Sequence, residues 1–369
     1  MLGVLMCVLA GTLSAPVGAA ELRGLWVDAW HPGFKSPVET SAMVSKAREC
    51  KFNALFVQAR KRGDVYYNSS IEPMAKDVPL GYDPLADVVA KAHAAGLQVH
   101  AWISVYEVYH DTKWTSSDPR QVHIRHPEWL MKDDRGRNNF PGDKVFLDPG
   151  LPEVQAYLTG IVEEIVRNYN VDGIHLDIAR YPGREGGYND ASIARFNKET
   201  AGTGKPDKDD EGWCDWRRAQ VTQFVQTAYE KATRIRRQVK VSAAVSANRS
   251  NAYWHRFQDW EGWLRAGILD FAVPMVFAKD TRVFQAGCTE IAALATGRPI
   301  YIGQGGFKMS AENSLKQISI AREAGFAGIV VYSYACCSEP HEDDASSLMD
   351  ELKSGHFAQP DTVPAISRK

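Results

Sequence analysis

The sequence predicts an α/β fold, a (β/α)8 TIM barrel with long third and fourth βα loops, and three observations support it. Short apolar runs rich in β-forming residues alternate along the chain with segments of helical period. Glycines follow several helical segments, as is typical of helix C-termini. Polar side chains follow the apolar runs, where a barrel enzyme builds its active site. Such alternation is typical of a parallel sheet, and about eight units close a barrel.

The expected elements follow one another in a regular order. The predicted strands cover residues 22–29, 54–59, 98–105, 173–177, 240–246, 271–277, 299–303 and 328–334. The predicted helices cover residues 41–49, 84–95, 152–169, 215–236, 260–266 and 312–324, and a short helical signal follows at 348–352. The connections at 106–150 and 181–213 are much longer than ordinary loops. We therefore expect them to form walls over the mouth of the barrel.

Three regions are expected along the chain. Residues 1–20 contain no charged side chain and end in a run of small residues, which predicts a signal peptide. Residues 21–353 form the barrel domain, and residues 354–369 form a C-terminal tail that we expect to be frayed. The apolar run in the signal peptide is too short for a stable membrane anchor. The protein is thus expected to be secreted or periplasmic.

The composition of the 369 residues is that of a globular protein, with 44% hydrophobic and 24% charged residues. A net charge of −2 and scattered Lys and Arg residues argue against nucleic acid as a partner, and we expect a monomer. Five cysteines follow residue 20, an odd number without the CxxC spacing of zinc sites. We therefore predict no metal, no cofactor and no dense disulfide framework.

The strand at 173–177 ends in the most informative side chain of the sequence. Side chains alternate along a strand, so His175 and Asp177 share one face. Asp177 then lies at a strand end, where barrels place catalytic groups. Two other interpretations stay open, in which Asp177 pairs with Arg180 or caps the next helix. His175 comes two residues earlier on the same face, below Asp177, and is expected to be a hydrogen-bonded core histidine.

Polar and aromatic side chains also follow the other strands and would meet at the same mouth. Amides, guanidinium groups, carboxylates and aromatic rings that converge without a phosphate-binding loop favour a carbohydrate ligand. The predicted substrate contacts are Trp30, Gln58, Arg60, Arg62, Arg180, Tyr181, Asn248, Lys279, Tyr332 and Tyr334.

Cleavage of a glycosidic bond needs a proton donor and a second carboxylate that stabilises the oxocarbenium centre, attacks it or activates water. Asp177 is the first candidate and Glu107 the second, although a shift of one residue in strand register would turn Glu107 outward. Asp28 and Asp280 are alternatives, for which an ion pair or a loop cap is the simpler interpretation. A separation of about 5 Å between the two carboxyl groups would indicate a mechanism that retains the configuration of the sugar. A separation of about 6.5–9.5 Å would indicate one that inverts it.

Arg60 and Arg62 lie with Asp64 in the second βα loop. Guanidinium groups bind carboxylates through paired hydrogen bonds, so this loop could hold a substrate carboxylate such as the lactyl group of muramic acid. A structural pair between arginine and Asp64 is the alternative.

Four motifs resemble those of a known family. They are ELRGLWV at 21–27, FNALFVQAR followed by RGD within 52–64, LQVHAWI at 97–103, and LDPG at 147–150 leading into VDGIHLD at 171–177. These motifs resemble those of the glycosyl-hydrolase-like ten proteins of bacterial envelopes. They occur in the same order, and the resemblance spans nearly the whole mature chain. The resemblance implies a barrel that acts on or binds extracytoplasmic glycans, and one branch of the family looks like hydrolases of peptidoglycan glycan strands.

The resemblance also implies that Asp177 and Arg180 belong to the site. Two departures bear on the chemistry. Many relatives carry a second acid directly after the strand-four aspartate, where this chain has Ile178, and the fifth strand ends in Ser246 to Asn248 rather than in an acid. Three functions therefore remain open: a secreted glycoside hydrolase, a catalytically degenerate glycan-binding barrel, and a metal-dependent polysaccharide deacetylase.

Overall fold

A computed structural model describes residues 20–110, 118–340 and 344–368. Residues 1–19 of the expected signal peptide lie outside the described residues. In the ranges that are described, no helix has both the length and the apolar character needed to cross a membrane.

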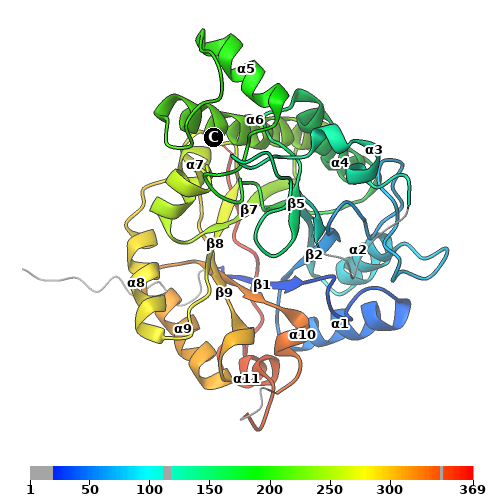
Figure 1. Cartoon of the computed structure of the whole chain (residues 1–369). Coiled ribbons are helices and arrows are strands. Elements are labelled where there is room, and N and C mark those ends of the chain that lie inside the picture. Colours follow the sequence, from blue (N-terminus) through cyan, green and yellow to red (C-terminus); the bar gives the residue numbers. More distant parts are fainter. Residues whose placement is uncertain (1–19, 111–117, 341–343, 369) are drawn as a thin grey trace, which may run out of the picture.

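Eight parallel strands close into a barrel in the order β1-β10-β9-β8-β7-β6-β3-β2, with helices around it (Figure 1). Every neighbouring pair in this ring is parallel, which confirms the predicted fold. The barrel strands are β1 Leu22–Val27, β2 Ala54–Arg60, β3 Gln98–Ser104, β6 Gly173–Asp177, β7 Lys240–Ser246, β8 Phe271–Val276, β9 Ile302–Gln304 and β10 Gly328–Tyr332.

The helices pack outside the barrel or lie in the loops at its mouth. Those after the barrel strands are α1 Pro37–Glu49, α2 Pro84–Ala94, α4 Pro152–Asn168, α6 Glu211–Ile235, α7 Trp260–Arg265, α8 Thr281–Ala292, α9 Ala311–Glu323 and α11 Leu348–Ser354. Shorter elements are α3 Val122–Arg125, α5 Asp190–Thr200, α10 Tyr334–Cys337, 3-10 turns at Pro127–Trp129 and Gly306–Lys308, and a π-helical turn at Asn251–His255.

The interior of the barrel is filled with side chains, as expected for this fold. Trp26, Phe56, Trp102 and Phe271 are buried in one apolar cluster there. The ring of His100 stacks on Phe56, with 4.6 Å between ring centroids. It occupies the space beside Gly173 on the adjacent strand, where a Cβ atom would stand 2.1 Å from His100 Nδ1. Glycine at position 173 thus lets β6 lie against β3.

The two long loops contain structure that the sequence did not predict. A hairpin of β4 Glu107–His110 and β5 Lys144–Phe146 stands in the third βα loop, and α5 lies in the fourth. Asp148 is fully buried between the loops and accepts hydrogen bonds from the backbone N–H groups of Gly150 at 2.8 Å and Asn189 at 3.3 Å. Because burial disfavours the charged form, the pKa of Asp148 rises to about 6.

The side chain of Asn189 strengthens the same connection by donating to the backbone oxygens of Glu128 and Leu130, at 2.8 and 2.9 Å. Together with Asp148, these bonds join the two walls of the mouth.

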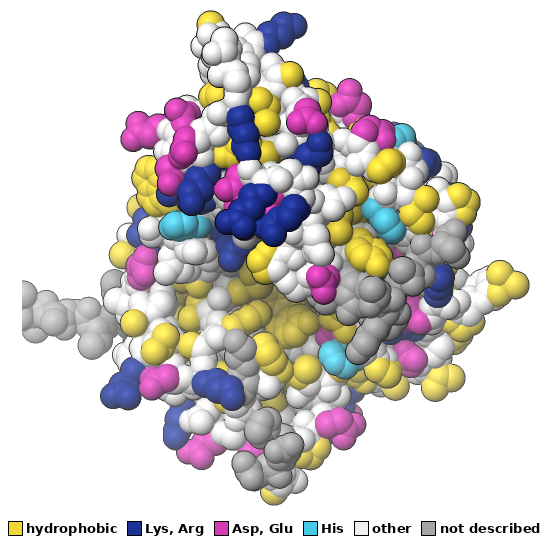
Figure 2. Space-filling model, viewed as in Figure 1, with side chains coloured by type: hydrophobic (Ala, Val, Ile, Leu, Met, Phe, Trp, Pro, Cys, Tyr) yellow, Lys and Arg dark blue, Asp and Glu magenta, His cyan; other side chains and the backbone are white. Residues whose placement is uncertain are grey.

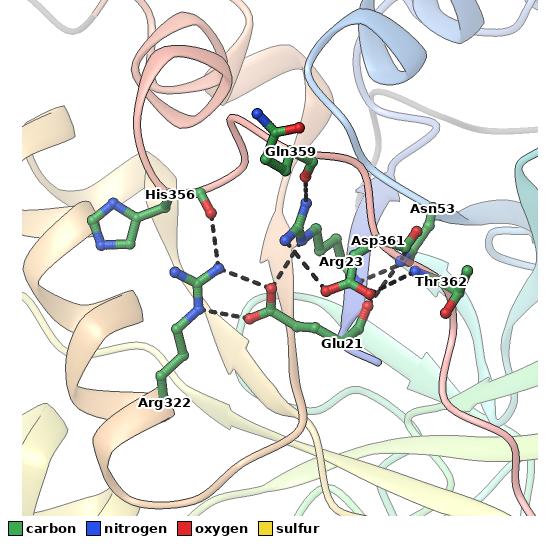
Figure 3. A network of polar contacts seen from close by, with 8 residues as sticks. All are labelled: Glu21, Arg23, Asn53, Arg322, His356, Gln359, Asp361 and Thr362. Atoms are coloured by element: carbon green, nitrogen blue, oxygen red, sulfur yellow. Dashed lines mark hydrogen bonds and ion pairs between the residues drawn. The ribbon is translucent and has the colours of Figure 1, made fainter. Parts of the chain in front are cut away.

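The prediction of a frayed C-terminal tail is wrong. The tail lies along the end of the barrel where the strands begin, and Figure 3 shows Arg23 binding Asp361 and the backbone oxygen of Gln359 there. Arg322 pairs with Glu21 and also donates to the backbone oxygen of His356 (Figure 3).

Further along the tail, Val363 and Ile366 pack against the interior apolar cluster. Arg368 binds the fully buried carboxylate of Asp270 at 2.8 and 2.6 Å. The tail is held because it covers apolar surface and supplies a counter-ion to a buried charge.

We predict that Arg368→Ala lowers the free energy of unfolding by about 2 kcal/mol, since it removes hydrogen bonds to a buried carboxylate. Denaturant titration of the purified protein measures this. The exposed arginine of the Arg282–Asp280 pair offers a matched control, Arg282→Ala, which should change stability by less than about 0.5 kcal/mol. Equal losses for the two variants would contradict a binding role for the tail.

Candidate active site

The carboxyl ends of the barrel strands open onto a hollow face. In Figure 2 hydrophobic side chains occupy this hollow, and Lys and Arg side chains gather beside it. A cavity of about 1010 Å³ lies between the third and fourth βα loops and the loop after β7, and Glu107, Lys144, Arg180 and Arg256 are among its lining residues.

Aromatic rings meet at this end of the barrel. Tyr332, at the end of β10, lies 6.0 Å from Trp26, 6.3 Å from Trp102 and 5.9 Å from Phe277 between ring centroids. Tyr332 and Phe277 are partly exposed. Rings with exposed faces are suited to stacking on sugars.

Asp177 is partly exposed at the end of β6. Its Oδ2 accepts a hydrogen bond of 3.1 Å from the indole N–H of Trp102, and its Oδ1 accepts one of 2.8 Å from the backbone N–H of Ile178. Ile178 has φ of +54°, a left-handed conformation that is costly for a β-branched residue. The chain thus turns sharply directly after the carboxyl group.

The surroundings of Asp177 favour its protonated form. Burial of the carboxyl group raises its pKa, and the negative charge of Glu107 raises it further. The positive charge of Arg180 and the two hydrogen bonds oppose this shift without cancelling it. Asp177 therefore keeps its proton to a higher pH than an ordinary aspartate.

Glu107 begins the hairpin strand β4 and faces the cavity, so the outward orientation considered above does not occur. Its side chain is 4% exposed and forms ion pairs with Arg62 at 3.0 Å and Lys144 at 3.1 Å. Arg62 also lies over the ring of Trp30, 4.0 Å from its centroid. Asp177 and Glu107 thus differ in environment: one is desolvated, and the other is ion-paired.

Asp28 lies at the end of β1 with its carboxylate buried. It accepts hydrogen bonds from Ser333 Oγ at 2.6 Å and from the backbone N–H of Trp30 at 3.0 Å, and it pairs with His31 Nδ1 at 2.7 Å. The side chain of His31 is 49% exposed. His31 was not predicted as a site residue, although its position three residues after Asp28 was a usable signal. Asp28 is placed to orient this imidazole rather than to contact substrate.

Asp280 is an exposed helix cap. It precedes α8, and its side chain accepts hydrogen bonds from the backbone N–H groups of Arg282 and Val283. These hydrogen bonds are those of a cap, the simpler interpretation considered for Asp280 from the sequence. Asp280 is therefore not part of the candidate site.

Arg60 also differs from expectation. Its side chain is fully buried and binds both carboxylate oxygens of Glu72, each at 2.7 Å. The pairing with Asp64 considered from the sequence does not occur for Arg60, because Asp64 accepts a hydrogen bond from the backbone N–H of Arg62 instead. We therefore withdraw Arg60 as a substrate contact and assign it to the scaffold.

Two other predicted contacts are part of the scaffold. Gln58 is buried. Its side-chain oxygen accepts a hydrogen bond of 2.9 Å from the backbone N–H of Ala29, and its amide nitrogen donates one of 3.2 Å to Ser104 Oγ. Tyr181 is fully buried, with its ring 5.4 Å from that of Phe257. Neither side chain has the exposure that a substrate contact needs.

The remaining predicted contacts are accessible. Asn248 and Lys279 are exposed, and Asn248 caps the turn that follows it by accepting from the backbone N–H of Asn251. Tyr332, Tyr334, Trp30 and Arg180 are partly exposed. They stay candidates for substrate binding.

His175 is a core histidine, as expected. Its Nε2 accepts a hydrogen bond of 3.2 Å from the indole N–H of Trp26, so its Nδ1 donates to Ser242 Oγ at 2.9 Å. Burial holds the pKa of His175 well below its ordinary value. The side chain is thus a neutral part of the scaffold beneath Asp177.

A closed (β/α)8 barrel with acidic, basic and aromatic groups at its mouth has the architecture of glycoside hydrolases. The chain belongs to the glycosyl hydrolase-like 10 family, whose family model matches residues 21–304.

Named relatives and solved structures agree with this assignment. The chain is 28% identical to the glycosyl hydrolase DigH of Escherichia coli K12 over 69% of its own length and 65% of the length of that relative. It is 24% identical to the glycosyl hydrolase YngK of Bacillus subtilis over 94% of its length and 74% of that protein.

Among solved structures, the glycoside hydrolase domain of PgaB (BpsB) from Bordetella bronchiseptica matches with a TM-score of 0.65 at 14% identity, covering 92% of this chain and 98% of that one. The catalytic domain of β-amylase from Paenibacillus polymyxa matches with a TM-score of 0.64 at 12% identity, covering 93% of this chain and 100% of that one. At this level of identity the structural likeness establishes the fold. With the family assignment, it supports a glycosidase-type function.

Arg60 and Arg62 provide a test of the distinction between scaffold and site. Arg60→Ala is expected to lower the free energy of unfolding by about 3–5 kcal/mol, because it leaves the buried carboxylate of Glu72 without its counter-ion. Arg62→Ala should lower the free energy of unfolding by clearly less, since Arg62 is partly exposed and Glu107 keeps its ion pair with Lys144. Chemical denaturation measures both variants. Equal stability of the two variants would contradict the scaffold role of Arg60.

Proposed function

We propose that the protein is a secreted or periplasmic enzyme that hydrolyses O-glycosidic bonds of a polysaccharide, with the glycan strands of peptidoglycan as its first candidate substrate. The observation that carries this proposal is the desolvated, partly exposed carboxyl group of Asp177 at the barrel mouth, close enough to Glu107 for the two charges to interact. The family assignment supports the reaction class.

In the proposed mechanism, Asp177 donates a proton to the leaving oxygen of the glycosidic bond. Its raised pKa suits this role, because a proton donor must keep its proton near the working pH. Glu107, ion-paired and facing the cavity, is the second carboxylate. It stabilises the positive charge that develops on the sugar ring or directs a water molecule to it.

The aromatic rings at the mouth would hold sugar rings beside these two groups. Tyr332 is partly exposed. Burial raises its pKa above the ordinary value, and the charges of Asp28, Cys336 and Asp177 raise it further. Tyr332 ends β10, which pairs with β1, and its ring lies 6.3 Å from that of Trp102, the donor to Asp177. A sugar stacked on it would have its neighbouring glycosidic bond within the mouth.

A catalytically degenerate glycan-binding barrel is the second candidate function. The observation in its favour is that two cations, Arg62 and Lys144, already neutralise Glu107. A carboxylate engaged in this way can be purely structural. For the third expectation, a metal-dependent deacetylase, the described ranges contain no group of three or more His, Cys, Asp or Glu side chains placed to hold a metal ion. No feature of the described site therefore favours deacetylation.

We predict that Asp177→Asn lowers the release of reducing ends from peptide-free glycan strands by at least about 100-fold, since it removes the proton donor. The free energy of unfolding should change by no more than about 1–2 kcal/mol. A matched control is Asp190→Asn, which makes the same change at a side chain that is 85% exposed on α5.

If Asp177→Asn retains turnover, another acid performs the chemistry. Wild-type protein that binds the strands without forming products would indicate the glycan-binding alternative, and release of acetate would indicate deacetylation. A panel of plant and algal polysaccharides, tested in parallel, identifies a different polymer if the strands are not cut.

The pH dependence of the reaction gives a second test. Because Asp177 must be protonated and its pKa is raised in the folded protein, kcat/KM should fall as pH rises through this elevated pKa. Substitution Trp102→Phe removes a hydrogen bond that favours the charged form, so it should move this limb of the profile to higher pH. An unchanged limb would indicate that Asp177 is not the group that titrates.

A further inference from the structure

Two arginines face the cavity from adjacent segments of the chain. Arg180 follows β6, and Arg256 follows the π-helical turn after β7. Both line the cavity of about 1010 Å³ that also contains Glu107. The backbone N–H of Tyr181 donates to the backbone oxygen of Arg256 at 3.0 Å, which fixes the two segments side by side.

Neither guanidinium group has a carboxylate within ion-pair distance in the ranges that the structure describes. The side chain of Arg180 donates only to the backbone oxygen of Tyr181, at a long 3.5 Å, and that of Arg256 donates to the amide oxygen of Asn251 at 3.4 Å. Three of the other cations that line the same cavity are engaged in ion pairs. Lys144 pairs with Glu107, Arg137 with Asp133 and Arg184 with Asp209.

The two positive charges repel each other. Burial lowers the pKa of Arg180 and the neighbouring charge of Arg256 lowers it further, while the charges of Asp177 and Glu107 offset only part of this shift. Partly buried cations that lack a direct ion-pair partner are costly, and an anion bound between the two guanidinium groups would relieve their repulsion. The cluster of Lys and Arg side chains beside the hollow in Figure 2 makes this side of the mouth positive.

We propose that Arg180 and Arg256 together bind the carboxylate of an acidic sugar residue in the substrate. Planar guanidinium groups present paired N–H donors that match the two oxygens of a carboxylate. Arg180 comes three residues after Asp177, just beyond the end of β6, so the acidic sugar would bind next to the bond that is cut. The role considered for Arg60 and Arg62 from the sequence is thus assigned to a different pair. This inference rests on the proposed function, because it names the chemical class of the substrate of the same site.

The test uses the Asp177→Asn protein, which should bind without turnover. Its affinity is measured by calorimetry for two probes: soluble peptide-free glycan-strand fragments with free lactyl carboxylates, and the same fragments after reduction of the carboxylates to alcohols. We expect the acidic fragments to bind about 10-fold more tightly or better, as for hydrogen bonds to a charged group. Adding Arg180→Gln or Arg256→Gln should remove this preference and leave the affinity for the reduced fragments within about two-fold.

A matched control is Arg234→Gln, which neutralises an arginine that is 73% exposed near the end of α6. It should keep the full preference. A preference for acidic fragments that survives in both arginine variants would overturn the inference, as would equal binding of the two probes or no binding of either.

The outcome for the proposed function is separate. Arginine-dependent binding of acidic fragments by a wild-type protein that releases no products would support the carboxylate site and contradict hydrolysis. Cleavage of acidic and reduced strands at equal rates, abolished by Asp177→Asn, would support hydrolysis and contradict the carboxylate site.

Discussion

The pairing of β3 with β6 determines the environment of the candidate catalytic group. In this register Ser104 lies opposite Asp177, and Trp102 lies opposite His175. The indole of Trp102 can therefore reach forward to the carboxyl group, while the ring of His100 occupies the space left by Gly173. A shift of one residue would turn these side chains to the other face of the sheet. The acidity of Asp177 thus depends on strand register as much as on its own identity.

The charged side chains of the barrel fall into two groups. Buried carboxylates in the scaffold, such as Glu72 and Asp270, have arginine partners that hold the barrel together. At the cavity, Glu107 is neutralised by two cations, and Arg180 and Arg256 have no carboxylate within ion-pair distance in the described ranges. The first kind stabilises the fold, and the second leaves positive charge available to a ligand. Sequence position alone does not distinguish them, because Arg60 at the end of β2 and Arg180 just beyond β6 hold similar places along the chain.

Much of the fold could be predicted from the sequence because strands and helices alternate with clear periods. The boundaries of α2, β6 and β7 lie within one or two residues of expectation. Helix α8 was missed because its cap, Asp280, was considered as a site residue and its segment contains Gly287. Strand β9 is displaced from 299–303 to Ile302–Gln304. The hairpin β4–β5 was missed because its strands pair across more than 30 residues of loop, a contact that periodicity does not report.

For the candidate site, the sequence placed Asp177, Glu107, Arg62 and Tyr332 at the mouth but could not separate exposed from buried groups. Gln58 and Arg60 lie in β2, and Arg62 comes just after it; only packing shows that the first two are enclosed. Arg256 was not predicted because it comes eight positions after Asn248, directly after a π-helical turn without a sequence signature. The chain distance between two residues says little about their proximity once long loops fold back over a barrel.

The buried carboxyl of Asp148 and the amide of Asn189 give the two long loops a shared centre. The walls of the mouth are thus a single cooperative unit, and a substitution in one should alter the consequences of a substitution in the other. Loop exchange between homologous barrels, a common route to new specificity, would here succeed only if both loops were transferred as one module.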